Sequence, residues 1–198
     1  MYNRKLHDDS GSFVVIDNAY GAEIAVGYLV NLGHRHIAYI SGQMTFSTSI
    51  DRYSGYRQGL AQNNIEFDES LVYFGDYNYN KSYVVTAEIL KNHPEVTAIF
   101  AGNDLMAIGA INSIIDRGGK VPEGISVVGF DDIELSGYRG INLTTISQEK
   151  TDMANCAFDI LLKRIEDMQF CSRIWLKPQL LARGTCAPHK TEVSGLLE

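Results

Sequence analysis

Short apolar runs rich in β-branched residues alternate with longer amphipathic stretches between residues 13 and 132. The runs predict strands and the stretches predict helices, because a strand buried on both faces of a parallel sheet is apolar throughout, whereas a surface helix is apolar along one stripe. The predicted strands are 13–16, 36–40, 71–74, 96–100 and 125–130. The alternation is typical of an α/β fold with a doubly wound parallel sheet.

The clearest β-α-β unit runs from residue 96 to residue 132. After Gly102, Asn103 is placed to cap the following helix, and Asp104 lies in its first turn, where the helix dipole favours negative charge. Ligands of such sheets collect beyond the carboxyl ends of the strands. We therefore expect Asn103 and Asp131, which each follow a buried strand, to lie on one surface.

Beyond residue 132 the regular alternation of predicted strands and helices ends. It predicts a short strand, a long helix and two further β segments, at 143–146, 149–168, 174–176 and 179–181. The polar segments at the two ends predict a disordered leader, 1–12, and a tail, 189–198.

Composition narrows the possible functions. The formal net charge of the 198-residue chain is -7, which argues against a nucleic-acid interface, because phosphate binding needs a concentrated basic face. No apolar run is long enough to span a bilayer, and the first residues lack the apolar core of a signal peptide. Three cysteines without Cys-x-x-Cys spacing favour reduced thiols in a cytoplasm. We expect a cytoplasmic protein that does not contact membranes.

The sequence patterns that mark catalytic or metal sites are missing. His34 and His36 could offer two imidazoles, but one histidine is expected at a helix end and the other at a strand start, so structural roles are favoured over metal binding. Asp131 and Asp132 are neighbours, a poor arrangement for an acid and a base acting across a substrate. Neither a phosphate-binding glycine loop nor a nucleophile elbow is present. We predict no enzyme activity, no metal and no cofactor.

Several motifs follow one another along the chain. They are Asp17-Asn18, LGHRHIA at 32–38, Arg52 with Gly55-Tyr56, GNDLMAIGA at 102–110, ISVVGFDD at 125–132 and LTTISQ at 143–148. Together they closely resemble the effector-binding region of the lactose/galactose-repressor family of bacterial transcription regulators. The resemblance implies the type I periplasmic-binding-protein fold, in which two α/β lobes close on a ligand. It also implies that the helix-turn-helix and most of the first lobe are absent from this chain.

By this resemblance, residues 13–188 form a partial effector-binding domain. The second lobe would comprise about 18–142 and 174–188, and incomplete remnants of the first lobe would be 13–17 and 143–173. The helix at 149–168 would then lack native neighbours along its apolar face, formed by Met153, Ala157, Ile160, Leu161 and Ile165. We expect this face to pack against a second copy of the chain or to fold back on the second lobe, because an exposed apolar face is costly.

Two residues match ligand-contacting positions of the family most directly. Arg52 would bind vicinal hydroxyls or a carboxylate with its planar guanidinium, although it could also be a solvent-facing arginine paired with Asp51. Asp131 would accept hydrogen bonds from sugar hydroxyls, or it could merely cap a turn.

Other candidates are weaker. Asn103 could bind ligand while also capping its helix. Tyr77 matches a loop aromatic that stacks on a sugar ring or base, although loop aromatics often only cover the edge of a core. Thr48 and Phe46 are candidates by position alone. Asp17 falls at the crossing between lobes, where we prefer a hinge role to a ligand contact.

The favoured function is the effector-sensing part of a repressor that binds a sugar or similar small metabolite, such as a nucleobase-like molecule. Its contact with DNA would run only through the helix-turn-helix outside this chain, and the protein would be a homodimer. The alternative is a transport-associated sugar-binding protein of the same fold. An upstream helix-turn-helix would support the regulator, and an upstream signal peptide the transporter. We expect the chain alone to bind effector weakly, because part of the cleft is missing.

Overall fold

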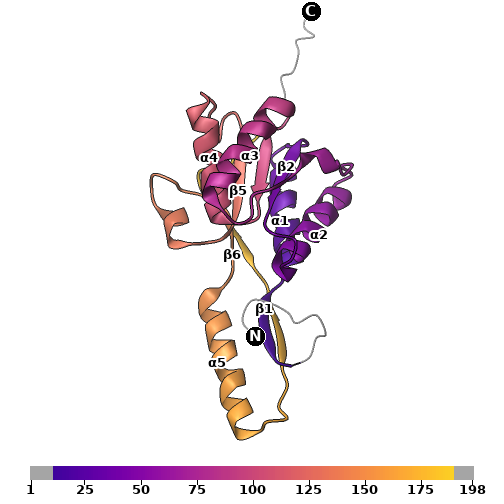
Figure 1. Cartoon of the computed structure of the whole chain (residues 1–198), viewed down its shortest axis with the longest axis vertical. Coiled ribbons are helices and arrows are strands. Elements are labelled where there is room, and N and C mark those ends of the chain that lie inside the picture. Colours follow the sequence, from indigo (N-terminus) through magenta and orange to yellow (C-terminus); the bar gives the residue numbers. More distant parts are fainter. Residues whose placement is uncertain (1–10, 190–198) are drawn as a thin grey trace, which may run out of the picture.

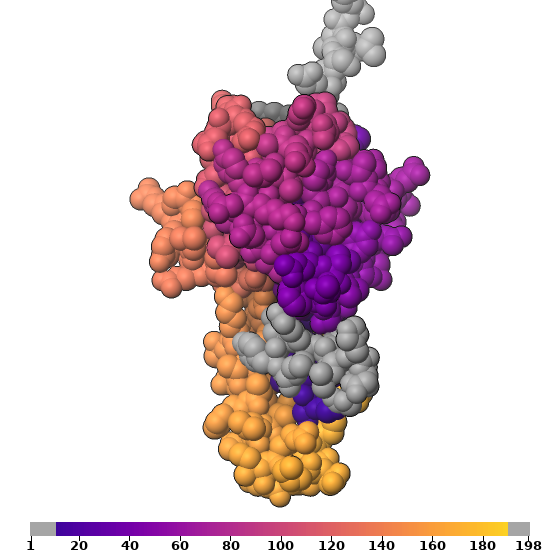
Figure 2. Space-filling view, viewed as in Figure 1, coloured from indigo at the N-terminus to yellow at the C-terminus, as the bar shows by residue number. Residues whose placement is uncertain are grey.

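The computed structural model describes residues 11–189, which form a large body and a small body. The large body holds a six-stranded sheet with four helices, and the small body holds two strands and one helix below it (Figure 1). Space-filling shows the small body as a narrow extension of the large one (Figure 2). The chain crosses between the two bodies three times, after β1, after β6 and after β7.

The large body confirms the predicted doubly wound α/β sheet. Its strands are β2 (Ile37–Ser41), β3 (Val72–Phe74), β4 (Ala98–Ala101), β5 (Ser126–Asp131), β6 (Thr144–Ser147) and β8 (Gln179–Leu181). They lie in the order β3-β2-β4-β5-β6-β8, and only β8 runs antiparallel to its neighbour. The helices are α1 (Asn18–Asn31), α2 (Ser47–Gln62), α3 (Tyr79–Asn92) and α4 (Asp104–Asp116), with 3-10 turns η1 (Glu69–Leu71) and η2 (Glu134–Gly137).

Two hydrophobic cores fill the two faces of this sheet. Side chains alternate between the faces along each strand, so Tyr39 packs with α1 and α2 while the next residue, Ile40, packs with α3 and α4. Both residues are fully buried. Burial on both faces explains why the strands read as continuous apolar runs in the sequence.

The small body consists of β1 (Phe13–Ile16), β7 (Arg173–Leu176) and α5 (Lys150–Glu166). The two strands pair in parallel, and Val14 and Ile16 of β1 form a core with Met153 and Ile160 of α5. Residues from the two ends of the described chain therefore meet in one small sheet.

The lobe boundaries differ from those expected. The segment at 143–146 was assigned to the first lobe, but β6 pairs with β5 inside the large sheet. The segment at 174–176 was assigned to the second lobe, but β7 pairs with β1. The chain thus leaves the large body after Ser147 and returns between β7 and β8. Apolar runs mark strands in the sequence, but they do not specify the partner strand, which is why the assignment failed.

The expectations for the long helix need correction as well. Met153 and Ile160 do have neighbours, since both are buried against the strands of the small body. The helix packs on β1 and does not fold its apolar face back over the large body. Leu161 and Ile165 remain exposed, on the side of α5 that faces away from that core.

The predicted leader and tail fall mainly on residues 1–10 and 190–198, which lie outside the described residues. Within residues 11–189, no helix is long and apolar enough to cross a lipid bilayer.

Candidate functional site

Arg52 lies inside α2 and is only 3% exposed, so the solvent-facing alternative is wrong. Its Nη2 lies 3.1 Å from Oδ1 of Asp131, at the end of β5. Nη1 donates to the backbone carbonyl of Gly102, and Nε donates to Oδ1 of Asn18 at 2.8 Å. The guanidinium therefore joins two strand ends to the start of α1.

The ion pair is partly open to solvent on its acidic side. The guanidinium carbon of Arg52 lies 3.6 Å from the centre of the Phe130 ring, which covers one face of the cation. The Asp131 side chain is 24% exposed, compared with 3% for Arg52. The carboxylate is therefore the more accessible member of the ion pair, and the arginine holds it in place.

The backbone at this edge adopts conformations that side-chain-bearing residues rarely use. Asp131 has a φ of 112°, Asp132 a φ of 47° and Tyr77 a φ of 57°. Holding a residue other than glycine in such a conformation costs on the order of 1–3 kcal/mol, and residues of this kind cluster at functional sites. Two of the three residues are predicted ligand contacts, so strain and candidate chemistry coincide.

Tyr77 joins the same edge from the loop after β3. Its hydroxyl lies 2.7 Å from Oγ of Ser49 and 3.4 Å from Oγ1 of Thr48, in the first turn of α2. Its ring covers Gly42, where a Cβ would lie 2.1 Å from the ring. The Phe46 ring lies nearly parallel to it, with centroids 6.4 Å apart. The structure therefore brings Phe46, Thr48 and Tyr77 together.

Asn103 caps α4, as its sequence context predicted. Its Oδ1 accepts a hydrogen bond from the backbone N–H of Met106 at 2.9 Å, and the residue is 8% exposed. It directly follows Gly102, whose carbonyl accepts from Arg52. The structural role is confirmed, and a ligand contact stays a prediction.

The Asp104 carboxyl group connects several elements of the structure. The sequence predicted only that its negative charge would be favourable in the first turn of a helix. Its Oδ2 accepts from the backbone N–H of Ile133 at 2.8 Å, and its Oδ1 accepts from Oγ1 of Thr145 at 2.5 Å. Burial raises the pKa of Asp104 to about 7, and the nearby carboxylates of Asp131 and Asp132 also raise it, against these hydrogen bonds. The carboxyl links α4 to the loop after β5 and to β6.

This raised pKa predicts a pH-dependent stability. The ordinary pKa of an aspartate side chain is 3.8. Between about pH 4 and 7, Asp104 is therefore protonated in the folded chain but deprotonated in the unfolded chain. The free energy of unfolding should therefore fall by up to about 1.4 kcal/mol per pH unit as pH rises through this range. Urea unfolding from pH 4.5 to 7.5 should show this slope in the difference between the wild type and Asp104→Asn, in which the contributions of other titrating groups cancel. A pH-independent difference would contradict it.

A second set of contacts fixes the loop after β5. Arg183, in the segment following β8, places Nη2 2.7 Å from Oδ1 of Asp132 and donates from Nη1 to the carbonyl of Leu143. Lys150, the first residue of α5, donates from Nζ to the Asp132 carbonyl. The sequence offered no signal for Arg183, because its partners lie about 40 or more residues away.

Residues on two of the crossings between the bodies form hydrogen bonds with the Arg52–Asp131 ion pair. Gln148, between β6 and α5, donates from Nε2 to Asp131. Asn18, after β1, accepts from Arg52 and donates to the Ile16 carbonyl at 3.0 Å. Both residues belong to motifs quoted above, but their partners became visible only in three dimensions.

Asp17 lies on the first crossing, where a hinge residue was predicted. Its side chain accepts from the backbone N–H of Tyr20 and caps α1. Its own N–H donates to the carbonyl of Leu176, which ends the strand before the third crossing, at 2.9 Å. The residue therefore connects two crossings, and its hinge role stays a prediction.

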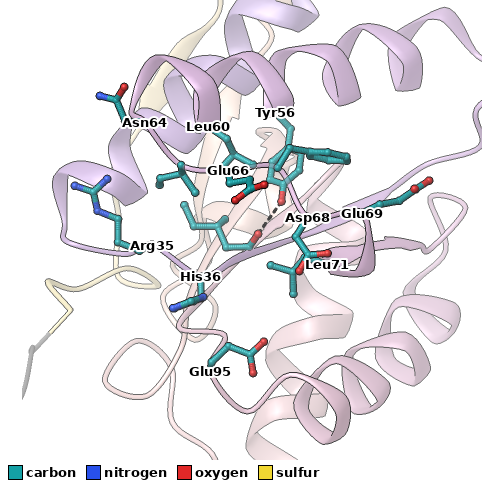
Figure 3. A pocket seen from close by; sticks show the side chains of 13 residues that line it. Arg35, His36, Tyr56, Leu60, Asn64, Glu66, Asp68, Glu69, Leu71 and Glu95 are labelled. Atoms are coloured by element: carbon teal, nitrogen blue, oxygen red, sulfur yellow. Dashed lines mark hydrogen bonds between the residues drawn. The ribbon is translucent and has the colours of Figure 1, made fainter.

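A separate cavity of about 840 Å³ lies at the opposite edge of the sheet, near the start of β2 (Figure 3). Its labelled side chains include Arg35, His36, Glu66 and Glu95, and it contains none of the predicted site residues. Tyr56 also lines it, and its hydroxyl donates to the backbone carbonyl of Ile37 at 2.8 Å. The candidate site is thus an open rim and not this cavity, as expected if another surface must close over it.

Comparisons with known proteins agree with this geometry. The family model of the periplasmic binding protein-like domain matches residues 26–186. The HTH-type transcriptional repressor PurR of Vibrio atlanticus (strain LGP32) is 35% identical over 173 residues, which cover 86% of this chain and 52% of the repressor. The chain spans about half the length of the curated relatives it matches.

Solved structures show the same relationship. A complex of the transcriptional regulator CelR with cellobiose is 33% identical, with a TM-score of 0.84 over 88% of this chain and 54% of that one. A LacI-family transcriptional regulatory protein from Corynebacterium glutamicum is 32% identical, with a TM-score of 0.82 over 96% of this chain and 72% of that one. The chain therefore belongs to the periplasmic binding protein-like domains and, among them, to the LacI family of transcriptional regulators.

Proposed function

We propose that this chain is the effector-sensing part of a transcriptional repressor, and that a sugar or nucleobase-like metabolite binds at the carboxyl edge of its sheet. The ion pair between the buried Arg52 and the partly exposed Asp131 is the observation that carries this proposal. It presents a fixed, partly exposed carboxylate, which suits hydroxyl or N–H donors of a small polar ligand. Tyr77 offers a ring face for stacking at the same edge.

The same contacts suggest how binding is transmitted. Gln148 donates to Asp131 and Asn18 accepts from Arg52, so two of the three crossings hydrogen-bond to the proposed ligand-binding pair. A ligand that bonds to Asp131 competes with Gln148 for the carboxylate. It can shift the relation of the two bodies only by its different affinity for the two arrangements. We propose that these two residues act as the hinge contacts, with Asp17.

The wider context is part of the proposal. The curated relatives are named as HTH-type transcriptional regulators, and the regulator CelR is solved as a complex with cellobiose. We therefore propose that DNA contact runs through a helix-turn-helix outside this chain. We also propose a cytoplasmic homodimer without catalytic activity. The transport-associated alternative is not favoured, because the relatives are transcriptional regulators.

Ligand titration followed by NMR tests the proposed site. A panel of mono- and disaccharides and purines at millimolar concentration should contain a ligand that shifts the amide signals near Asp131, Asn103 and Tyr77. We expect weak binding, because the relatives carry about as much chain again, and calorimetry showing sub-micromolar affinity would contradict that expectation. Asp131→Asn should weaken binding by about 10-fold or more, because it removes the charged acceptor.

A control separates local binding from general effects. Asp116→Asn alters an exposed carboxylate at the far end of α4 and should leave the affinity unchanged. Signals that move around the cavity of Figure 3 instead, with no response at Asp131, would contradict the proposed site.

A further inference from the structure

The cavity near the start of β2, which we call the amino-edge cavity, has the size and the apolar lining of a small-molecule site (Figure 3). Its volume of about 840 Å³ lies within the range of roughly 300–1,000 Å³ that is typical of ligand pockets. Its lining includes five buried or half-buried apolar or aromatic side chains, those of Ile37, Tyr56, Leu60, Ile65 and Leu71. The cavity lies at the opposite end of the strands from the proposed effector site, so it is a second, separate candidate site.

The mouth of the amino-edge cavity is acidic. Its four carboxylates belong to Glu66, Asp68, Glu69 and Glu95. Among the lining residues that the structure describes, Arg35 is the only arginine or lysine, and its Nη1 donates to the backbone carbonyl of Asn63. Within residues 11–189, neither Glu66 nor Glu69 forms an ion pair. The negative charge at the mouth is therefore largely uncompensated, and a hollow lined by one sign of charge attracts ions of the other sign.

Hydrogen bonds keep two of these carboxylates ionised. The hydroxyl and the backbone N–H of Ser70 donate to Asp68 and hold the pKa of its carboxyl group below its ordinary value. The backbone N–H of Glu95 and the side chain of His93 lower the pKa of Glu95 in the same way. The mouth therefore keeps this charge even in mildly acidic solution.

The arrangement of the carboxylates favours an organic cation over a metal ion. Among the described residues, no group of three or more His, Cys, Asp or Glu side chains could hold a metal ion. Figure 3 shows the carboxylates of Glu66 and Glu95 at separate positions around the cavity. A linear polyamine matches both the separated charges and the apolar lining, because methylene segments, which bind apolar surface, separate its ammonium groups. Amines with a pKa of about 10 are also charged at neutral pH.

We propose that the amino-edge cavity binds a linear polyamine. Its ammonium groups pair with the carboxylates of Glu66, Asp68 and Glu95, and its methylene segments lie on the apolar lining. The Tyr56 hydroxyl donates its proton to the Ile37 carbonyl, so its oxygen can still accept a hydrogen bond from an ammonium group. The proposal does not depend on the proposed effector site.

Titration of the full chain with spermidine at low salt, followed by NMR and calorimetry, tests the site. The backbone amide signals of His36, Glu66 and Asp68 should shift and reach saturation. Magnesium chloride at the same concentration should leave these signals in place, because it lacks the methylene segments. Raising the NaCl concentration from about 20 to about 300 mM should weaken spermidine binding at least about 5-fold, because salt screens the attraction between charges.

A double variant tests the role of the carboxylates. Glu66→Gln combined with Asp68→Asn should weaken spermidine binding at least about 10-fold, because it removes two charges and keeps the shapes of the side chains. Asparagine retains an acceptor for the backbone N–H of Ser70, so the turn η1 should stay folded. The matched control is Glu88→Gln combined with Asp116→Asn, which removes two exposed carboxylates on α3 and α4 and should leave the affinity unchanged. Circular dichroism should show both double variants folded.

Three results would each overturn the proposal. They are the lack of a saturable shift at these amides, the same shift with magnesium, and equal affinities in the double variant and its control. An oligolysine peptide that binds here when spermidine does not would indicate a protein partner and would also overturn it. A response of Asp131 to sugars or purines is measured separately, so failure at one site is distinguishable from failure at the other.

Discussion

Replacing Arg52 with alanine is expected to lower the free energy of unfolding by about 3 kcal/mol. The substitution leaves the Asp131 carboxylate without its cation and removes the donors to Asn18 and to the Gly102 carbonyl. Removing the buried arginine is destabilising because its acceptors in the interior lose their hydrogen bonds and the Asp131 carboxylate, 24% exposed, is only partly solvated. The cation also loses its contact with the Phe130 ring. Urea unfolding monitored by circular dichroism measures the change.

The control for this prediction is Arg139→Ala, at an exposed position in the loop before β6. It should change the free energy of unfolding by less than about 0.5 kcal/mol, as surface substitutions generally do. Arg52→Lys keeps the charge but loses the planar fork and should fall between the two. If Arg52→Ala unfolds like Arg139→Ala, the ion pair does not organise this edge of the sheet.

Gly55→Ala should destabilise the large body by a comparable amount, about 3 kcal/mol. A Cβ on Gly55 would lie 2.1 Å from the backbone carbonyl oxygen of Ala19, in the first turn of α1. Relief requires the two helices to separate, since a backbone atom cannot rotate away as the end of a side chain can. This movement would also displace Arg52, which lies one turn earlier on α2 and bonds to Asn18. The unfolding midpoint in urea reports the loss.

A matched glycine lies in the neighbouring helix. Gly27 in α1 has no atom within 4 Å of its built Cβ, so alanine there should stabilise the chain by about 0.5–1 kcal/mol through helix propensity. Opposite signs for the two substitutions are the expected result. Equal and small effects would mean that α1 and α2 can separate without cost.

The sequence predicted which residues meet at the sheet edge better than it predicted which strands belong to each lobe. Arg52 and Asp131 were matched to a common site through ordered motifs, and the structure places them 3.1 Å apart. The assignment of 143–146 and 174–176 to lobes was wrong, because β6 and β7 each pair with a strand that local pattern does not identify. Motifs carry information about site chemistry, whereas strand partners depend on long-range packing.

The sequence by itself determined the elements and the family of this protein. Continuous apolar runs specify strands buried on both faces, and caps such as Asn103 specify where helices begin, because both are short-range effects. Only the tertiary structure decided how those elements act together. The contacts of Gln148 and Asn18 with the ion pair, and the side of α5 that stays exposed, depend on packing between residues far apart in the chain. Such contacts follow from the assembled sheet, so no local pattern could reveal them.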